Sequence, residues 1–546
     1  MAKYVIGTDY GTLSGRTVLV DVATGEELAE AVLEYPHGVM DEALPCGKRL
    51  PASYALQHPA DYLKVLKVTV PQVLAQAGVS AADVVGFGID FTACTVLPVD
   101  ENARPLCMKA EYAENPHAYV KLWKHHAAQP QADEINALAE ERGEAWLPIY
   151  GGKISCEWAL PKILQVLREA PEVYENTARF IEAGDWMSWM LTGEETHSAV
   201  FAGYKGLWNA ETGYPSNDFM KALDKRLDGI VGTKLSLRVL GMDRIAGRIN
   251  EAGAELTGLA VGTPVALPMI DAHAAMPALN ITGDGDLMLI EGTSACHILN
   301  ANEKKNVEGI CGYVKDGVIP GLYTYEAGQA AVGDIFDWFV HHCVPDTYMA
   351  EAKERGLNIH KLLREKASRL APGESGLLAL DWLGGNRSIL VNSDLTGMIL
   401  GLHLNTKPEE IYRALIEATA FGLRVIVEQY EKSGIVINNI CAAGGIAQKD
   451  EMMMQIYADV LNREIQIAGS NQAGALGSAI YASVAGGAYA DVKTAAEKLS
   501  KPPVKVYQPI ASHHATYSEL YAEYKTLHDY FGKTNMVMER LRKIGK

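Results

Sequence analysis

Short runs of apolar and β-branched residues, bounded by glycine and small polar residues, recur along the chain. Two such runs near the start, 4–8 and 17–21, flank a turn rich in Gly, Thr and Ser, a pattern that predicts a β-hairpin. A similar pattern returns at 287–291 and 296–299, on either side of a second Gly-Thr-Ser turn. Two similar hairpins about half a chain apart predict two lobes related by an ancient duplication.

Two longer apolar runs predict buried strands that end in acidic residues. Residues 84–90 (VVGFGID) and 265–271 (VALPMID) are apolar until their last position, where Asp90 and Asp271 stand. A carboxylate at the end of such a strand would be held on a rigid element.

Helical periodicity is clearest over 406–431, where apolar residues recur at helical spacing. Thr406 and Glu409 have the spacing of a capping box at its start. Two further helices are expected, at 448–461 and 474–485. Strands alternating with helices favour the α/β class.

The length of 546 residues corresponds to about three or four domains at roughly 150 residues each. The repeated hairpin reduces this to two large lobes with insertions. The stretch 281–287, which contains Gly283 and Gly285, is the expected boundary. We therefore expect lobes at 1–281 and 282–546.

Composition narrows the class of protein. Apolar residues make up 48% and charged residues 21%, which fits a globular protein and excludes bulk disorder. The formal net charge of −18 and the lack of a long basic run predict neither nucleic acid nor a membrane as partner. The eight cysteines form no CxxC pair, and no secretory signal or run of about 18 apolar residues is present. A cytoplasmic location is expected.

The segment 9–16 (DYGTLSGR) carries groups suited to an anion. Backbone N–H groups near its glycines can close around a phosphate, and hydroxyl groups add donors. The expected phosphate-binding residues here are Gly11, Thr12 and Ser14. Arg16 would add positive charge, and Asp9 could hold a magnesium ion through water. A polar hairpin turn without a ligand is the alternative.

Two glycine-containing turns in the second half of the chain supply further candidate nucleotide-binding residues. The second hairpin supplies further candidate phosphate-binding residues, Gly292, Thr293 and Ser294. The pair Gly444-Gly445, which leads into a helix, offers a flat surface on which an adenine could lie. Gln448, at the start of the predicted helix, completes the candidate adenosine site.

Together these segments resemble the FGGY carbohydrate kinases, within the superfamily that includes actin, hexokinase and the heat-shock ATPases. The resemblance extends from the first hairpin to about Gly487 and includes 152–162 and 397–417, which look like the family's two signature stretches. It implies a two-lobed actin/hexokinase-like fold, a duplicated ribonuclease H-like architecture, with ATP and sugar in the cleft between the lobes.

Four further stretches resemble the branch of this family that phosphorylates L-ribulose. They are 88–100, 117–129, 202–208 and 268–275. The resemblance implies transfer of a phosphoryl group from ATP, with Mg²⁺, to L-ribulose in L-arabinose catabolism. The alternatives are a kinase for D-ribulose, xylulose or ribitol, and a non-catalytic ATP switch of the actin or chaperone type.

The family's catalytic base matches Asp271. We expect it to project from the end of a strand and to accept the proton of the attacking hydroxyl, the task a carboxylate performs in phosphoryl transfer. Ala272 and His273 follow it, where many relatives carry an amide residue. The group that orients the base is therefore left open.

Sugar contacts are expected, by the same resemblance, from the backbone around Ala93 and from Lys205 and Glu326. The small side chain of Ala93 leaves room for several 2-ketopentoses. A surface or ion-pair role is the alternative for Lys205 and Glu326. Trp123 could form a pocket wall, and an amphipathic helix face is its alternative.

Helices expected over 516–542 leave the oligomeric state open. They could serve the interface of a homodimer or simply pack on the second lobe.

Overall fold

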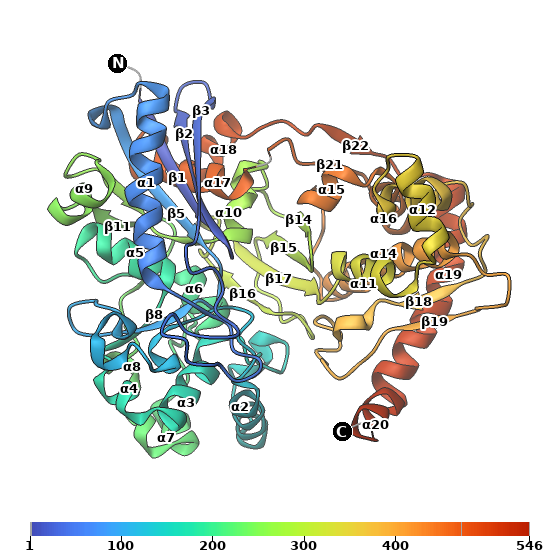
Figure 1. Cartoon of the computed structure of the whole chain (residues 1–546), viewed down its shortest axis with the longest axis horizontal. Coiled ribbons are helices and arrows are strands. Elements are labelled where there is room, and N and C mark those ends of the chain that lie inside the picture. The colour runs from blue at the N-terminus through green and yellow to red at the C-terminus, as the bar shows by residue number, and fades with distance from the viewer. Residues whose placement is uncertain (1–2, 471, 545–546) are drawn as a thin grey trace. The chain divides into compact units, whose positions relative to one another are not determined.

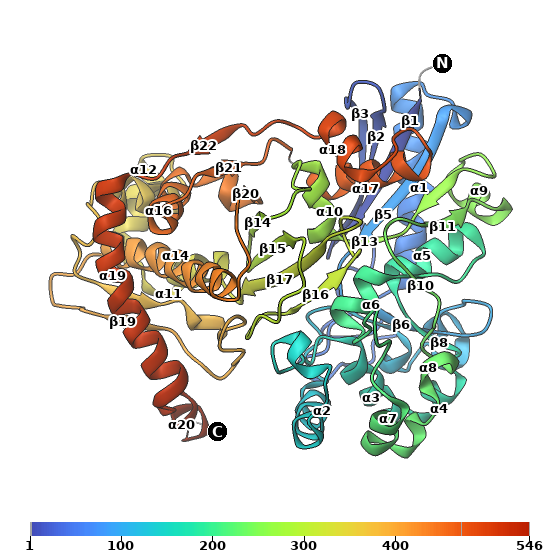
Figure 2. The ribbon, with the colours of Figure 1, turned by 180° about the vertical axis from the view of Figure 1, so that it is seen from behind.

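The computed structural model describes residues 3–470 and 472–544, and these form two compact units, each described here by itself (Figures 1 and 2). The first unit contains 3–282, 313–324 and 472–501. The second contains 283–312, 325–470 and 502–544.

The first unit is built on a mixed sheet. Across the sheet the strands are β11 (Ile245–Arg248), β12 (Pro264–Ala266), β5 (Val84–Phe91), β1 (Tyr4–Tyr10), β2 (Ser14–Asp21) and β3 (Glu27–Glu34), with β13 (Met269–Ile270) also paired to β5. β1, β2 and β3 are antiparallel, whereas β1 and β5 run parallel. The first predicted hairpin is confirmed, because β1 and β2 pair along their whole length.

Helices cover both faces of this sheet. On one face, α17 (Ala473–Ala485) packs so closely that a Cβ added to Gly7 of β1 would lie 1.9 Å from the carbonyl oxygen of Ala475. On the other face, the Thr17 hydroxyl lies 2.7 Å from that of Thr69 on α1 (Pro59–Ala77). Glycine is therefore required at position 7, and the predicted helix 474–485 is confirmed.

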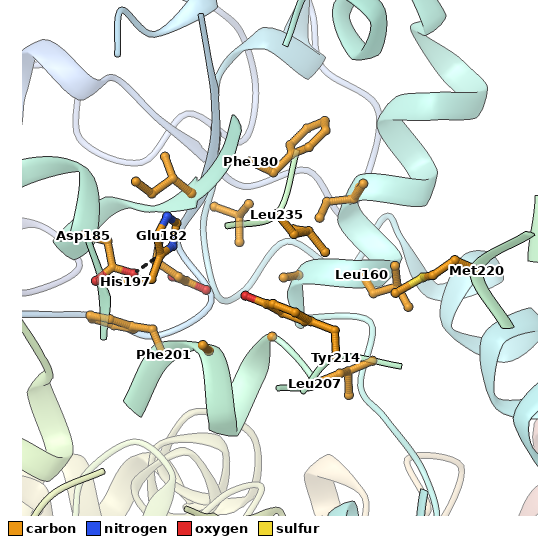
Figure 3. Close-up of a pocket in the computed structure, with 16 residues that line it drawn as sticks. Leu160, Phe180, Glu182, Asp185, His197, Phe201, Leu207, Tyr214, Met220 and Leu235 are labelled. Atoms are coloured by element: carbon orange, nitrogen blue, oxygen red, sulfur yellow. Dashed lines mark ion pairs between the residues drawn. The ribbon is translucent and has the colours of Figure 1, made fainter. Parts of the chain in front are cut away.

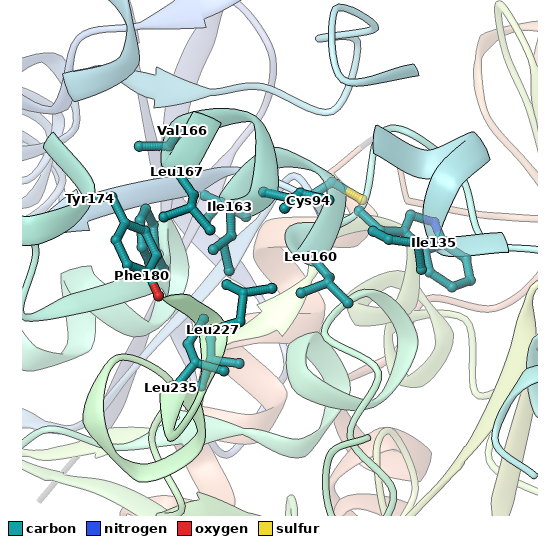
Figure 4. Close-up of a cluster of buried hydrophobic side chains, with 14 of the residues drawn as sticks. Cys94, Ile135, Leu160, Ile163, Val166, Leu167, Tyr174, Phe180, Leu227 and Leu235 are labelled. Atoms are coloured by element: carbon teal, nitrogen blue, oxygen red, sulfur yellow. The ribbon is translucent and has the colours of Figure 1, made fainter. Parts of the chain in front are cut away.

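The rest of the first unit contains a small antiparallel sheet with a core of its own. Its strands, in order, are β4 (Leu56–Gln57), β7 (Val120–Lys121), β6 (Val96–Val99) and β8 (Arg179–Glu182). Figure 4 shows part of this core, in which Ile163 on α3 (Ala159–Glu169) lies near Cys94, Phe180 and Leu235. The loop that joins β5 to β6 is thus anchored on well-packed side chains.

The second unit repeats the arrangement of the first. Its sheet has the order β17 (Tyr323–Gln329), β15 (Ala295–Ala301), β14 (Asp286–Glu291), β20 (Asn439–Ala443), β21 (Ile465–Ile467) and β22 (Lys505–Tyr507). β14 and β15 form an antiparallel hairpin, and β14 runs parallel to β20. The second predicted hairpin is therefore confirmed, and its relation to β20 matches that of β1 to β5.

The predicted strand 265–271 is wrong in its second half. The run divides into β12 and β13 around Leu267 and Pro268, and Asp271 is the first residue of α10 (Asp271–Ala278) rather than the end of a strand. Proline lacks the backbone N–H that a continuous strand would need for pairing, which accounts for the interruption.

Two helix starts also differ from the predictions. α14 (Pro408–Lys432) begins two residues late, because Pro408 takes the first turn and the Lys407 N–H donates to Glu410 Oε2 at 2.6 Å in place of the predicted cap. The predicted helix 448–461 is two helices, α15 (Gly445–Lys449) and α16 (Glu451–Leu461). Asp450 separates them, since its carboxylate caps α16 by accepting from the Met453 N–H at 3.0 Å.

Helix α19 (Ala511–Asp529) packs on α14 within the second unit. Tyr517 accepts a hydrogen bond from Arg413 (2.8 Å) and donates one to Glu417 (3.1 Å), both on α14. A homodimer stays a prediction. Within 3–470 and 472–544, no helix is both long and apolar enough to cross a membrane.

The two units are not consecutive halves of the sequence. Residues 313–324 and 472–501 group with the first unit, because α17 covers its sheet. The lobe limits 1–281 and 282–546 stay a prediction, and their outermost residues, 1–2 and 545–546, lie outside the described residues.

Candidate active site

Three aspartates lie at the ends of neighbouring parallel strands of the first unit, two within the strands and one directly after. Asp9 and Asp90 are register partners near the ends of β1 and β5. Ile270, the last residue of β13, pairs with Phe91, so Asp271 follows directly. The carboxyl ends of parallel strands meet at one edge of a sheet, which is where α/β proteins bind ligands. The sheet therefore brings the predicted base and the predicted metal-binding residue to one edge.

The electrostatics of this edge favour a cation or a shared proton. Burial raises the pKa of Asp90 well above its usual value, and the nearby negative charges of Asp9 and Asp271 raise it further. Burial also raises the pKa of Asp9, although the hydrogen bond with Asp90 and the charge of Arg16 oppose this shift. Asp90 Oδ2 accepts a hydrogen bond from Ser478 at 2.6 Å, whereas its buried Oδ1 accepts none from the described residues.

The start of α17 lies against the same carboxylates. A Cβ added to Gly474 would be 3.3 Å from Asp9 Cγ and 3.3 Å from Asp90 Oδ1. The N-terminus of a helix carries partial positive charge, so this placement stabilises negative charge on the pair.

The first phosphate turn is held in shape by side chains around it. The Gly11 N–H donates to the carbonyl of Ser14 at 3.0 Å. Three other residues donate to the turn: Tyr35 Oη to Gly11 O (2.9 Å), Gln57 Nε2 to Thr12 O (2.7 Å) and Trp123 Nε1 to Thr12 Oγ1 (3.2 Å). Trp123 lies in a turn after β7, so the alternative interpretation that it belongs to an amphipathic helix face is wrong.

Arg16 faces carboxylates on both sides. It is the register partner of Asp9, and its Nε lies 3.5 Å from Glu30 Oε1 on β3. Its charge opposes the rise that burial causes in the pKa of Asp9. The positive charge predicted beside the turn is therefore partly engaged by the protein's own acids.

Two of the three predicted sugar-binding positions lie in the first unit. Lys205 is the last residue of α6 (Ala199–Lys205) and is buried, with Nζ 5.6 Å from the centre of the Trp158 ring. Ala93 is the half-buried member of the loop after β5, and its carbonyl accepts from the Thr95 hydroxyl at 3.2 Å. Burial raises the pKa of neighbouring Cys94 well above its usual value, and the charge of Lys205 opposes this shift, which places the ammonium near this loop.

A buried acid supports the same loop. Glu182 Oε2 accepts from the Thr95 N–H at 2.8 Å, and burial raises the pKa of Glu182 to about 7 despite the nearby charge of Lys162. Glu182 also lines a cavity of about 40 Å³ with His197 and Tyr214 (Figure 3). The lining of this cavity includes neither Lys205 nor Asp271, so it is distinct from the predicted sugar pocket.

The second phosphate turn is held by backbone groups. The Gly292 N–H donates to Ser294 O at 3.0 Å, as in the first turn. The N–H groups of Val332 and Gly333, at the start of α11 (Gly333–Cys343), donate to Thr293 O (2.9 Å) and Gly292 O (3.0 Å).

The Gly-Gly turn adjoins this second turn. Gly444 has φ +95°, and a Cβ there would lie 2.4 Å from the carbonyl oxygen of Glu291, directly before Gly292. A Cβ on Gly445 would meet no atom within 4 Å, so the space above it is open. The Gln448 N–H donates to Gly444 O at 3.2 Å. An adenine on this surface stays a prediction.

The structure gathers the predicted residues into two groups. In the first unit lie Asp9, Gly11, Thr12, Ser14, Arg16, Ala93, Lys205 and Asp271; in the second lie Gly292, Thr293, Ser294, Glu326, Gly444, Gly445 and Gln448. Glu326 is buried on β17. The assembly of the two groups into one site stays a prediction.

Sequence reasoning left out Asp90, Ser478 and Glu182. Asp90 stands at the end of an apolar run, as Asp271 does, so the same sequence pattern could have identified it. Ser478 and Glu182 gave no signal, because their roles depend on contacts with residues distant in the sequence.

Comparison with known proteins agrees with this geometry. The N-terminal domain of the FGGY family of carbohydrate kinases matches residues 4–276, and the family's C-terminal domain matches 287–486. The chain belongs to the FGGY family of carbohydrate kinases. The predicted resemblance is confirmed.

Relatives of this FGGY kinase match it along nearly the whole chain. A ribulokinase of Halalkalibacterium halodurans is 53% identical over 546 residues, which cover 99% of this chain and 97% of that protein. A ribulokinase of Bacillus licheniformis is 53% identical over 537 residues, 97% of each chain.

Solved structures support the fold. The xylulose kinase from Rhodospirillum rubrum has a TM-score of 0.81 at 22% identity, covering 97% of this chain and 99% of that chain. The predicted two-domain actin/hexokinase-like fold is therefore confirmed. Membership of the family implies a sugar and ATP as substrates.

Proposed function

We propose that this FGGY kinase transfers the γ-phosphoryl group of MgATP to the terminal hydroxyl of L-ribulose, giving L-ribulose 5-phosphate in L-arabinose catabolism. The observation that carries the chemistry is the edge of the first sheet, where Asp9, Asp90 and Asp271 stand at the ends of parallel strands beside a glycine turn. The substrate is supported by full-length relatives named ribulokinase.

Asp271 acts as the base in this proposal. It accepts the proton of the attacking hydroxyl, and positioning with charge neutralisation supplies most of the remaining rate enhancement. The Ala272 N–H donates to Asp271 Oδ1 at 2.7 Å, which fixes the orientation of the carboxylate from its own helix. This hydrogen bond is one answer to what orients the base in the absence of a following amide side chain.

A magnesium ion fits the donors at this edge. Asp9 and Asp90 offer carboxylate oxygens, the type of ligand that Mg²⁺ prefers, and Asp90 Oδ1 accepts no hydrogen bond from the described residues. Bound there with ATP, the ion would neutralise charge on the phosphates. Thr12 and Ser14 donate to phosphate oxygens from the first unit, and Thr293 and Ser294 do so from the second. Gly11 and Gly292, whose N–H groups bond within the turns, let the phosphates approach the backbone closely.

The sugar is recognised by a small set of polar groups. Lys205 donates to hydroxyls of the ketopentose, Glu326 accepts from them, and the backbone around Ala93 completes the contacts. Because the Ala93 side chain is a single methyl group, we expect other 2-ketopentoses to be phosphorylated as well.

The test is an assay of ADP release with L-ribulose, D-ribulose, xylulose, ribitol and glycerol as acceptors. We expect the highest kcat/KM with L-ribulose and measurable turnover of the other ketopentoses. If D-ribulose, xylulose or ribitol is strongly preferred, the assignment moves to that kinase. If no sugar raises ADP release above the rate with ATP alone, the chain is an ATP switch and the proposal fails.

A further inference from the structure

Lys162 is a buried lysine whose charge is held by backbone groups. It lies on α3 and is 1% exposed, and the nearby acids Glu182 and Glu157 act on it through their charge. Its Nζ donates to three carbonyl oxygens: those of Cys94, Lys121 (3.3 Å) and Leu122 (2.9 Å). An ammonium group has three donors, so this cage satisfies all of them.

The three carbonyls belong to the two segments that meet at the expected sugar pocket. Cys94 directly follows Ala93, and residues 121–122 directly precede Trp123, which donates to Thr12 of the first phosphate turn. One side chain on a packed helix therefore ties together the loop that presents Ala93 and the segment that supports the phosphate turn.

The Ala93 loop depends on such support for its shape. Cys94 has φ +57°, a left-handed conformation that costs free energy for a residue with a Cβ and persists only where its surroundings enforce it. Thr95 is held by Glu182 through its N–H and bonds the carbonyls of Thr92 (2.9 Å) and Ala93 (3.2 Å) through its hydroxyl. Lys162 supplies the only described hydrogen bond to Cys94 O.

Burying a lysine is expensive, because the ammonium loses its water, and burial lowers the pKa of Lys162 despite the nearby acids. An apolar residue of similar length would fill the same space without that cost, but it would leave three buried carbonyls without this donor. The cage is therefore poorly explained by packing alone and well explained by a need to fix the three carbonyls.

We propose that Lys162 is a positioning residue for the ketopentose, which fixes the backbone of the Ala93 loop at the distance that the sugar requires. The proposal rests on the proposed function, since it assigns Ala93 to the sugar pocket. It makes a specific prediction about substrate affinity that a purely structural lysine does not make.

The test compares the steady-state kinetics of Lys162→Met, Lys162→Arg and wild type. A backbone displaced by about 1 Å can cost about 10²-fold, so Lys162→Met should raise the KM for L-ribulose by about 10- to 100-fold. The KM for MgATP should rise less, by no more than about fivefold, because the cage reaches the first phosphate turn only through the segment that carries Trp123. Lys162→Arg keeps the charge and donors, and should recover part of the affinity for the sugar.

Lys121→Met is the matched control. Lys121 is also buried in this part of the unit, and burial lowers its pKa to about 7, but its side chain faces His117 (3.4 Å) and the Tyr54 ring rather than the Ala93 loop. We expect Lys121→Met to lower Tm as much as Lys162→Met does, with an unchanged KM for L-ribulose.

Three results would overturn the proposal: an unchanged KM for L-ribulose in folded Lys162→Met, equal increases in both KM values, or the same sugar defect in Lys121→Met. If Lys162→Met does not fold, the kinetics of Lys162→Arg test the proposal instead, because the larger guanidinium must displace the Cys94 carbonyl. An unchanged KM for L-ribulose in Lys162→Arg would then reject the proposal. If wild type phosphorylates no ketopentose, it is the proposed function that fails.

Discussion

The two Gly-Thr turns share a backbone but are held in different ways. In each, the glycine N–H bonds a serine carbonyl at 3.0 Å within a hairpin that is followed by a parallel strand. The first turn is fixed by side chains, Tyr35, Gln57 and Trp123. The second is fixed by backbone N–H groups at the start of α11. Duplication has thus preserved the main-chain shape while its supports have changed.

The acidic residues that precede the two turns also differ in their surroundings. Asp9 is half-buried beside Asp90 at the carboxyl edge of its sheet. Glu291 is fully buried, with Oε1 3.7 Å from Nε2 of His297, which is itself fully buried. We infer that the first acid is placed for chemistry and that the second belongs to the interior of its unit.

The largest effect is expected at the base, and it tests whether the chemistry belongs to the first unit. Asp271→Asn should lower kcat by about 10²- to 10⁴-fold, since an amide cannot accept the proton, with the KM for ATP nearly unchanged. Glu291→Gln, an equivalent change in the second unit, should alter Tm but leave kcat within about threefold. Near-normal turnover of Asp271→Asn would remove it from its role.

Alanine at the turn glycines separates ligand contact from packing. Gly444→Ala should lower the free energy of unfolding by about 2–4 kcal/mol, because its Cβ would meet a backbone oxygen at a positive φ. At Gly11 and Gly292 the nearest atoms lie 3.5 Å and 3.7 Å from an added Cβ, so Tm should not change. If phosphates approach these turns, each variant should raise the KM for ATP by about tenfold, or about 1.4 kcal/mol. An unaffected KM in both would place the phosphates elsewhere.

The stability of the protein should depend on pH through the buried acid Glu182 of the first unit. The pKa of Glu182 is raised from 4.5 to about 7, so the folded state binds a proton more tightly than the unfolded chain. That contribution to stability is present below pH 4.5 and is lost as the pH rises through about 7. Relative to Glu182→Gln, wild type should therefore lose up to about 3 kcal/mol over this range. Urea unfolding of both at pH 5 and pH 8 checks it; a constant difference would contradict the shift.

The smallest effect concerns a side-chain support of the first turn. Trp123→Phe keeps an aromatic ring but removes the hydrogen bond to Thr12, which is worth about 1 kcal/mol. We expect a KM for ATP raised by about fivefold. The second turn has no corresponding side-chain donor among the described residues. If Trp123→Phe binds ATP like wild type, the side-chain supports of the first turn do not matter for ATP binding.

Local patterns predicted much of the fold and part of the site. Both hairpins and the helix at 474–485 followed from apolar periodicity and turn residues, which depend only on neighbours in the sequence. The strand 265–271 and the cap at Thr406 were wrong, because Pro268 and Pro408 changed the backbone where composition alone favoured regular elements. Asp90 was visible in the pattern but could not be distinguished from a structural acid.

The sequence by itself determined the α/β class and the paired glycine turns, and through the family resemblance it predicted a base at Asp271. Only the tertiary structure decided which groups act together. The Asp9–Asp90 pair, the Ser478 contact from α17 and the Lys162 cage join residues that lie tens to hundreds of positions apart. Hydrogen bonds and shared burial between such residues depend on the packing of sheets and helices, which no local pattern specifies.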